Sequence, residues 1–116
     1  MNEHYENIRK QLNKVQELAT KFCEYYSAND LYEYASTHEK SIKNIYEVLL
    51  DEKTYIDLKI KNDLEKYEQL SNLRNLLADL SDLLNSLLIN IDNQDNYLIN
   101  QYAKGIKDRL NNFNYQ

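Results

Sequence analysis

The sequence contains no proline, no tryptophan and a single glycine, Gly105. Proline and glycine are the usual residues of hairpins and tight turns, so their scarcity argues against all-β and α/β folds. Phosphate-binding loops of the GxGxxG and GxxxxGK types are excluded as well, because each needs several glycines. Leu, Lys, Glu and Gln are good helix formers, and the composition therefore predicts an all-α protein.

Cysteine and histidine are also scarce, with one Cys and two His in the chain. Cys23 cannot form an intramolecular disulfide and has no CxxC partner, so we interpret it as an unreactive thiol. His4 and His38 are far apart, and neither belongs to a histidine or Glu-x-x-His pair of metal-binding type. His38 lies on an apolar helix stripe, where a core or boundary histidine is the commoner explanation. We therefore expect no metal and no cofactor.

Carboxylates are plentiful, but they do not form a recognisable catalytic pair. Asp79 and Asp82 are one turn apart on the polar side of a Leu-rich helix, where a solvated face is the ordinary explanation. Glu33 and Glu39 are the other pair that we considered. No Ser, Cys or Lys stands in a recognisable nucleophile motif, so we predict no catalytic residues and a protein that is not an enzyme.

The charge balance argues against two further classes of partner. The formal net charge is −5 and the pI is near 5.0, whereas nucleic-acid binding is dominated by Lys and Arg. The most apolar stretch, residues 73–91, is interrupted by charged and amide side chains, which predicts no membrane insertion. The N-terminal residues MNEHYENIRK lack the apolar segment of a signal peptide, so we expect a cytoplasmic protein.

The first half of the chain has the spacing of amphipathic helices. Large side chains recur in steps of three and four over residues 5–26, which predicts one helix. Residues 27–30 shift the phase, and a second stripe continues over residues 31–49, with Asn29 or Asp30 as a suitable N-cap. Because no glycine or proline marks the shift, a single bent helix over the first half is the alternative.

Residues 51–54, DEKT, form the clearest polar interruption in the middle of the chain. We predict that the chain reverses direction there, with Asp51 or Thr54 as the N-cap of the next helix. Apolar residues then keep helical spacing over residues 60–91, about eight turns, which predicts one long helix. The predicted fold is an antiparallel helical hairpin or bundle of three to four helices, with this long helix in the C-terminal half.

The last quarter of the chain begins with a polar break at residues 91–96, and a short amphipathic segment comes after it over residues 97–106. Residues 109–116 are rich in Asn and lack periodicity, so the predicted domain spans residues 1–108 and ends in a disordered tail. The predicted core contains Ile8, Leu12, Val15, Phe22, Ile42, Ile45, Leu49, Leu64, Leu70, Leu77, Leu80, Leu84 and Leu87.

Apolar side chains of residues 73–91 cover more of the helix circumference than one antiparallel neighbour can bury. A third helix of the bundle or a homodimer is one explanation, and a groove for a partner's amphipathic helix is the other. In the second interpretation, residues 97–106 cover the leucines until a partner helix with basic flanks displaces them. The predicted partner-binding residues are Leu83, Leu87, Leu88, Ile91, Tyr97, Leu98 and Tyr102.

Two segments carry a resemblance to a known family. Residues 28–40, ANDLYEYASTHEK, combine a small residue, Asp-Leu, apolar spacing and Glu-Lys, and residues 101–105, QYAKG, come after the Leu-rich helix. Both resemble segments of the flagellar type III export chaperones of the FlgN and FliT type. The resemblance implies a monomeric or dimeric chaperone that captures the amphipathic helical terminus of a hook-associated protein through its Leu-rich half. It also implies export-gate contacts near Tyr102.

Together these observations predict a non-catalytic protein-binding protein of the cytoplasm. Its most specific form is a small export chaperone for flagellar assembly that captures an amphipathic helical segment of another protein. The alternative is a small helical immunity protein, antitoxin or phage-encoded inhibitor that occludes its target. A structural subunit of a helical assembly is a third possibility.

Overall fold

A computed structural model describes residues 2–26 and 31–113, which fold into a helical bundle with no β-strand among them. The all-α prediction is therefore confirmed, although these residues form five α-helices where three to four were predicted. Within these ranges, no helix combines the length and the apolar character needed to cross a membrane. The elements in chain order are α1 (Asn2–Tyr26), α2 (Leu31–Thr37), α3 (Glu39–Asn62), the 3-10 turn η1 (Leu64–Lys66), α4 (Tyr67–Asp92) and α5 (Asn96–Asn111).

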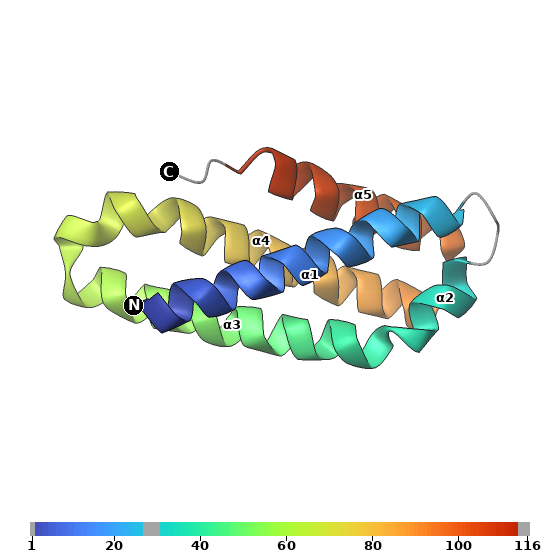
Figure 1. Cartoon of the computed structure of the whole chain (residues 1–116), viewed down its shortest axis with the longest axis horizontal. Helices are drawn as coiled ribbons and strands as arrows, with labels where there is room; N and C mark the ends of the chain where they lie inside the picture. The colour runs from blue at the N-terminus through green and yellow to red at the C-terminus, as the bar shows by residue number, and fades with distance from the viewer. Residues whose placement is uncertain (1, 27–30, 114–116) are drawn as a thin grey trace.

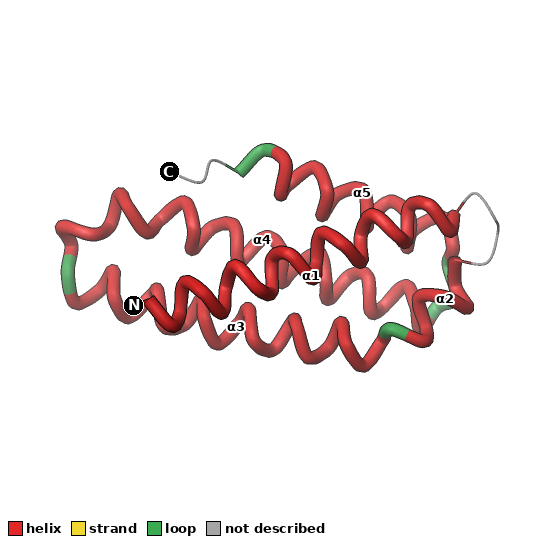
Figure 2. Tube along the Cα trace, viewed as in Figure 1, coloured by secondary structure: helices red, strands yellow, loops and turns green. Residues whose placement is uncertain are grey.

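Helices α1, α3, α4 and α5 form an up-and-down antiparallel bundle (Figure 1). α3 packs against α4, α4 against α5 and α5 against α1, while α1 makes a smaller contact with α3 that closes the ring. The short α2 lies at one end of the bundle, near the turn between α4 and α5 (Figure 2). Short connections favour this order, because consecutive helices can then lie side by side.

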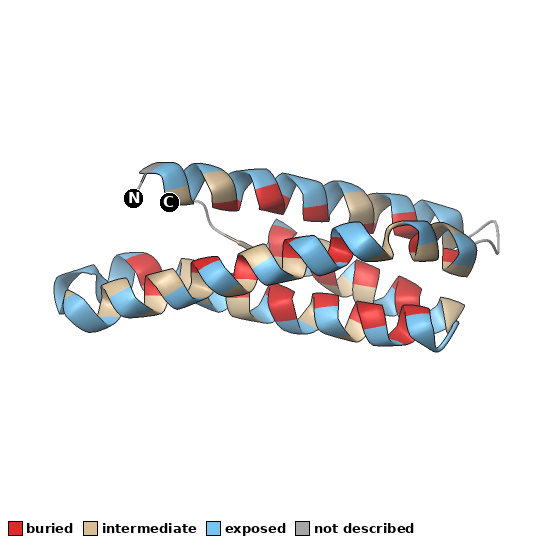
Figure 3. Cartoon of the chain, turned by 90° about the horizontal axis from the view of Figure 1, so that it is seen from below, coloured by how far each residue is buried: buried red, intermediate tan, exposed pale blue. Residues whose placement is uncertain are grey.

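Each long helix has a buried face toward the interior and an exposed face toward solvent (Figure 3). All predicted core residues are buried except Leu64, which is 76% exposed. Leu64 was predicted to lie inside a helix, but it belongs to η1, where the chain turns away from the core. The hydrophobic spacing therefore identified the core, and it failed where the helix that it assumed is interrupted.

The polar residues 51–54 lie inside α3 and do not form the predicted reversal. The Thr54 hydroxyl donates a hydrogen bond to the Leu50 carbonyl (3.0 Å), and Lys53 Nζ pairs with Asp57 Oδ2 one turn later (3.0 Å). Both interactions are local contacts that an α-helix accommodates, since residues four apart are neighbours on its surface. Glu52 of this stretch is buried, whereas Asp51 and Thr54 are exposed, so its polar character reflects the side-chain contacts of a continuous helix and marks no turn.

The chain reverses instead at Asp63 and η1. The Asp63 carboxylate accepts a hydrogen bond from the Glu65 N–H (3.2 Å), and the Asp63 N–H donates to the Lys59 carbonyl (3.0 Å). Asp side chains stabilise turns in this way without glycine or proline. The single long helix predicted over residues 60–91 is therefore wrong, because α4 begins only at Tyr67.

The apolar stripe over residues 31–49 predicted one helix, but a turn at His38 divides it into the short α2 and the beginning of α3. The His38 N–H donates to the Ala35 carbonyl (3.0 Å), which ends α2 in a tight turn, and α3 starts at the next residue. Leu31 and Ala35 of α2 remain fully buried, as the stripe predicted. The direction of the chain changes at His38 while the apolar face stays on the core.

A hydrogen bond links the beginning of α2 to the beginning of α5. The Tyr32 N–H donates to Asn96 Oδ1 (2.8 Å), so one of the free amides of the first helical turn is capped by a side chain from another helix. The predicted break at residues 27–30, with Asn29 or Asp30 as N-cap, lies outside the described residues.

The connection between α4 and α5 lies within the predicted polar break. Gln94 adopts a left-handed backbone conformation (φ 56°), and the Asp95 carboxylate caps α5 by accepting from the Leu98 N–H (3.0 Å). α5 extends to Asn111, and its Leu110 is buried. Residues 109–111 are therefore helical, although they were predicted to begin a disordered tail.

Candidate functional site

α1 meets its two neighbours through different kinds of side chain. Its contact with α5 is extensive and its contact with α3 is smaller. The buried apolar stripe of α1 includes Leu12, Val15 and Ala19. On the α3 side the stripe gives way to polar residues such as Asn7 and Lys14. We call this polar contact the α1–α3 seam.

One end of the α1–α3 seam is closed around a buried carboxylate. Glu52 of α3 is only 8% exposed. His4 Nδ1 lies 2.8 Å from Glu52 Oε2, and Asn7 Nδ2 donates to Glu52 Oε1 (3.1 Å). The His4 ring also stacks on Tyr55, with ring centroids 3.6 Å apart. Because a buried carboxylate requires hydrogen-bond partners, Glu52 fixes the first turns of α1 on α3.

Aromatic rings close the other end of the α1–α3 seam. Phe22 contacts Tyr34 edge to face, with centroids 5.7 Å apart, and Tyr25 stacks on Tyr34 at 3.8 Å. The His38 ring lies 6.2 Å from Phe22, and its Nδ1 is 3.0 Å from the Tyr34 carbonyl oxygen. His38 is half-buried and hydrogen-bonded, which fits the boundary position that the helix stripe predicted.

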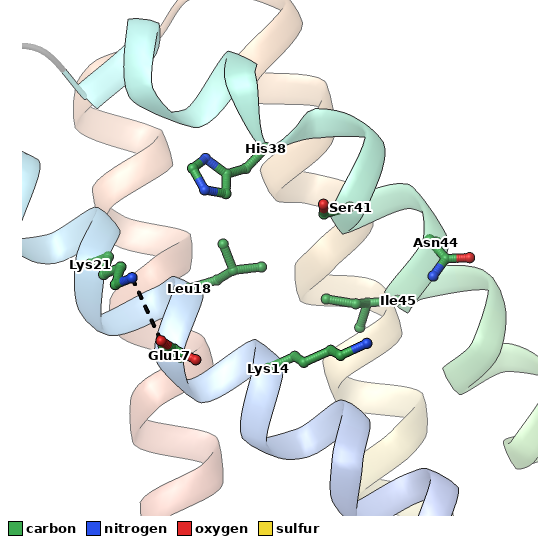
Figure 4. Close-up of a pocket in the computed structure, with 8 residues that line it drawn as sticks. All are labelled: Lys14, Glu17, Leu18, Lys21, His38, Ser41, Asn44 and Ile45. Atoms are coloured by element: carbon green, nitrogen blue, oxygen red, sulfur yellow. Dashed lines mark ion pairs between the residues drawn. The ribbon is translucent and has the colours of Figure 1, made fainter.

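Between these two ends the helices leave an open groove with a volume of about 310 Å³ (Figure 4). Its floor is apolar, since Ile45 is 2% exposed and Leu18 is half-buried against the core. The Leu18 and Ile45 side chains point toward each other across the groove. The groove is lined by Lys14, Glu17, Leu18 and Lys21 from α1, and by His38, Ser41, Asn44 and Ile45 from the other side.

The rim of the groove is polar, and several of its exposed groups have no partner among the described residues. Lys21 Nζ lies 3.6 Å from Glu17 Oε1, an ion pair one turn apart on α1. Lys14 has no ion pair with any residue that the structure describes, and Ser41 and Asn44 have no side-chain hydrogen bond within the same residues. Within this part of the chain, the groove thus offers an unpaired ammonium group, a hydroxyl and an amide around an apolar floor.

These side chains offer contacts for binding and do not form a catalytic pair among the described residues. Ser41 makes no hydrogen bond to His38, whose Nδ1 is engaged by the Tyr34 carbonyl and the Thr37 hydroxyl (3.0 Å). A nucleophile needs a base within hydrogen-bond reach. Residues 2–26 and 31–113 also contain no group of three or more His, Cys, Asp or Glu placed to hold a metal ion.

The Cys23 thiol is half-buried near the basic part of α5. Burial raises the pKa of Cys23, and the nearby Lys107 and Lys104 oppose this effect only in part. A thiol with a raised pKa is mostly protonated at neutral pH and is a poor nucleophile. The geometry agrees with the interpretation of Cys23 as an unreactive group.

Neither carboxylate pair considered from the sequence has its two members bonded to each other. Asp79 Oδ2 accepts from Arg109 Nε (2.7 Å), which joins α4 to α5. Glu39 instead interacts with Asp92, and a hydrogen bond between these carboxyl groups raises the pKa of Glu39, helped by partial burial and by the Asp92 charge. Both contacts link neighbouring helices near the surface of the bundle.

The structure does not bring the predicted partner-binding residues together on one open surface. Leu87 and Ile91 are each 2% exposed, and Leu88 is 9% exposed, so the bundle itself covers them. The expectation that another helix covers the surplus leucines is met, since α5 packs along α4. Of the rest of the predicted set, Leu83, Leu98 and Tyr102 are half-buried, and Tyr97 is 59% exposed.

A second groove, of about 460 Å³, runs along the outer contact between α4 and α5. From the predicted set, Leu83 alone lines this groove among the described residues. A Cβ atom added at Gly105 would lie 3.4 Å from Leu83 Cδ2, which is close to ordinary van der Waals contact. The other lining residues, Asp79, Asp82, Asp108, Arg109 and Asn112, are polar.

Sequence reasoning did not single out Lys14, Ser41 or Asn44. A signal for the α1–α3 seam was nevertheless present, because His4, Asn7 and Gln11 recur in steps of three and four beside the apolar stripe. Such a second, polar stripe indicates a helix face that meets another helix without forming core.

Comparisons of the chain with protein-family models, with curated proteins and with solved structures give no match.

Proposed function

We propose that this protein is a non-catalytic binding protein that holds an amphipathic helical segment of another protein in the groove of the α1–α3 seam. The observation that carries the proposal is the combination of an apolar floor, Leu18 and Ile45, with a rim whose Lys14, Ser41 and Asn44 lack partners among the described residues. Apolar grooves with polar rims recur in protein recognition.

A partner helix can lie across this groove and place side chains in it. Two antiparallel helices flank it, and its ends are closed by the Glu52 contacts and by the Phe22 ring cluster. The volume of about 310 Å³ holds a few side chains and is too small for a whole helix. A partner helix would therefore lie across the rim and insert apolar side chains spaced three or four residues apart.

Charge favours carboxylates on the bound segment. Lys14 is unpaired among the described residues, Lys21 is shared with Glu17, and no other carboxylate lines the groove. This expectation differs from the basic flanks predicted for a partner of the Asp-rich α4 stretch. Complementary charge at a rim mainly sets the association rate and the choice of partner.

The specific form of this function that we favour is a small export chaperone. Its support is the resemblance of residues 28–40 and 101–105 to export chaperones of the FlgN and FliT type. His38, which lies in the first of these segments, lines the groove. The partner would then be the amphipathic helical terminus of an exported protein.

Site-specific photocrosslinking in cells of the native host tests the proposal. A benzophenone amino acid is placed at Ser41 in the groove, and as a matched control at the exposed Thr54 of the same helix. We expect one protein to be captured from Ser41 and not from Thr54, through a helical segment that contains carboxylates. Equal capture from both positions, or capture from Thr54 alone, would refute the groove as the binding site.

The captured segment then serves as a peptide for a binding assay. Lys14→Glu should weaken binding by about tenfold, which corresponds to about 1.4 kcal/mol. Lys104→Glu is the control, because Lys104 is an exposed residue of α5 and the change of charge is the same. It should leave the affinity within about twofold. If both variants weaken binding equally, the effect is one of net charge and the groove has no special role.

A further inference from the structure

The hairpin formed by α3 and α4 extends beyond the rest of the bundle (Figure 1). The first turns of α1 meet α3 at Glu52, and the last turns of α5 meet α4 where Arg109 bonds to Asp79 (2.7 Å). The turn at Asp63 lies beyond both of these contacts. We call residues 58–68 the α3–α4 tip.

The α3–α4 tip exposes three large apolar side chains. Leu58 is 54% exposed, Leu64 is 76% exposed and Tyr67 is 55% exposed. Ile60 lies close by and is only partly buried against the core. Single exposed apolar residues are common, but several at one projecting end indicate a surface that another molecule covers.

The charges of the α3–α4 tip cancel, unlike those of the whole chain. The tip contains Lys59, Lys61 and Lys66 together with Asp63, Glu65 and Glu68, so its formal charge is zero, while the chain carries −5. Lys61, Lys66, Glu65 and Glu68 have no ion pair among the described residues. The tip therefore carries no net charge that would oppose the approach of a second copy of this acidic chain, and its separate charges of both signs can pair across such a contact.

We infer that the α3–α4 tip is a self-association surface at which two copies of the chain pack tip to tip. A two-fold axis places the end of α3 in one copy against the beginning of α4 in the other. Lys61 of each copy then faces the acidic side of the other, near Glu65 and Glu68, while Leu64 and Tyr67 are buried between them. A strongly acidic or basic partner would leave half of these charges repelled.

The inference is independent of the binding function proposed above. The α1–α3 groove lies between the Glu52 contacts and the Phe22 rings, away from the tip, so a tip-to-tip dimer leaves both grooves open. Such a dimer would present two grooves on one particle, which strengthens binding to a partner with two matching segments.

Sedimentation equilibrium of the full chain over a concentration series tests the inference. We expect a monomer–dimer equilibrium for the natural chain and at least about a tenfold larger dissociation constant for Leu64→Asp. Ile89→Asp, at an apolar residue of similar type that is 51% exposed on α4 away from the tip, is the control and should dimerise normally. Circular dichroism shows whether each variant is folded.

A second experiment exchanges charges at the proposed interface. Lys61→Glu and Glu65→Lys should each weaken self-association, and an equimolar mixture of the two should recover it as a heterodimer. A natural chain that stays monomeric throughout the series overturns the inference and leaves the tip to a different partner. A dimer that Leu64→Asp does not weaken overturns it too, because the interface then lies elsewhere.

Discussion

The two sides of α1 differ in the residues that they present to their neighbours. Toward the core and α5, α1 buries apolar residues such as Leu12, Val15 and Ala19. Toward α3 it uses a histidine, an asparagine and a lysine, and leaves a groove. The difference indicates a division of roles, in which one side supplies stability and the other supplies a surface whose exposed polar groups are available to a partner.

The physical basis of this division is the kind of interaction that each side makes on folding. Apolar burial contributes roughly 25 cal/mol per Å² without regard to partner geometry. Hydrogen bonds in a polar contact contribute little net energy but cost about 1–3 kcal/mol when a buried group is left unsatisfied. Gln11 is such a case, since it is 5% exposed and its Oε1 accepts no hydrogen bond from the described residues.

Leu12→Ala tests the apolar side and should have the largest effect. Leu12 is 4% exposed, so truncation removes apolar burial and leaves a cavity. The free energy of unfolding should fall by about 2–5 kcal/mol, as for Leu80→Ala in the centre of α4. Urea denaturation monitored by circular dichroism measures it. A loss below about 1 kcal/mol would mean that α1 is held mainly by its polar side, and would reverse the comparison.

Gln11→Met tests the polar side and should change stability in the opposite direction. Methionine keeps the length of the side chain and removes the unsatisfied oxygen, so we expect the free energy of unfolding to rise by about 1 kcal/mol. Asn7→Met, one turn away, is the matched control and should lower it by about 1–3 kcal/mol, because Asn7 bonds to buried Glu52. Equal effects at both positions would show that polarity alone, without pairing, decides stability there.

Gly105→Ala tests α5, the helix that supports the apolar side of α1, and should have the smallest effect. Gly105 lies inside α5, where glycine is about 1 kcal/mol less favourable than alanine. The added Cβ would meet Leu83 Cδ2 at 3.4 Å, close to ordinary contact. Thermal unfolding should therefore shift upward by a few degrees. A downward shift would show that α4 and α5 cannot separate slightly to admit the added methyl group.

The sequence predicted most of the core because apolar spacing reports burial directly. It misplaced the central turn because a polar stretch can be either a turn or a helix segment whose polar side chains face solvent or another helix. In residues 51–54, Asp51 and Thr54 are exposed, and Glu52 reaches His4 and Asn7 on α1, partners 48 and 45 residues earlier in the chain. The true turn at Asp63 is marked only by one carboxylate that caps Glu65. A long-range partner leaves no local signal, and a turn without glycine or proline leaves a weak one.

The candidate site was harder to predict than the fold. The predicted partner surface rested on surplus leucines in residues 73–91, and these leucines proved sufficient to face α3, α5 and α2 together. The groove depends on how far α1 lies from α3, which is determined by side chains such as Phe22 and Glu52 that fix its two ends. That separation is a property of packing in three dimensions, and a one-dimensional pattern does not contain it.

The closure of the bundle by α1 has a consequence during synthesis on the ribosome. α3, α4 and α5 are consecutive and pair by local contacts, which form quickly, whereas α1 completes its main contact only with α5, which is translated after α1, α3 and α4. The apolar stripe of α1 therefore leaves the ribosome well before its main cover. Until α5 has emerged, the stripe lacks that cover, which is the interval in which holding chaperones and premature aggregation compete for it.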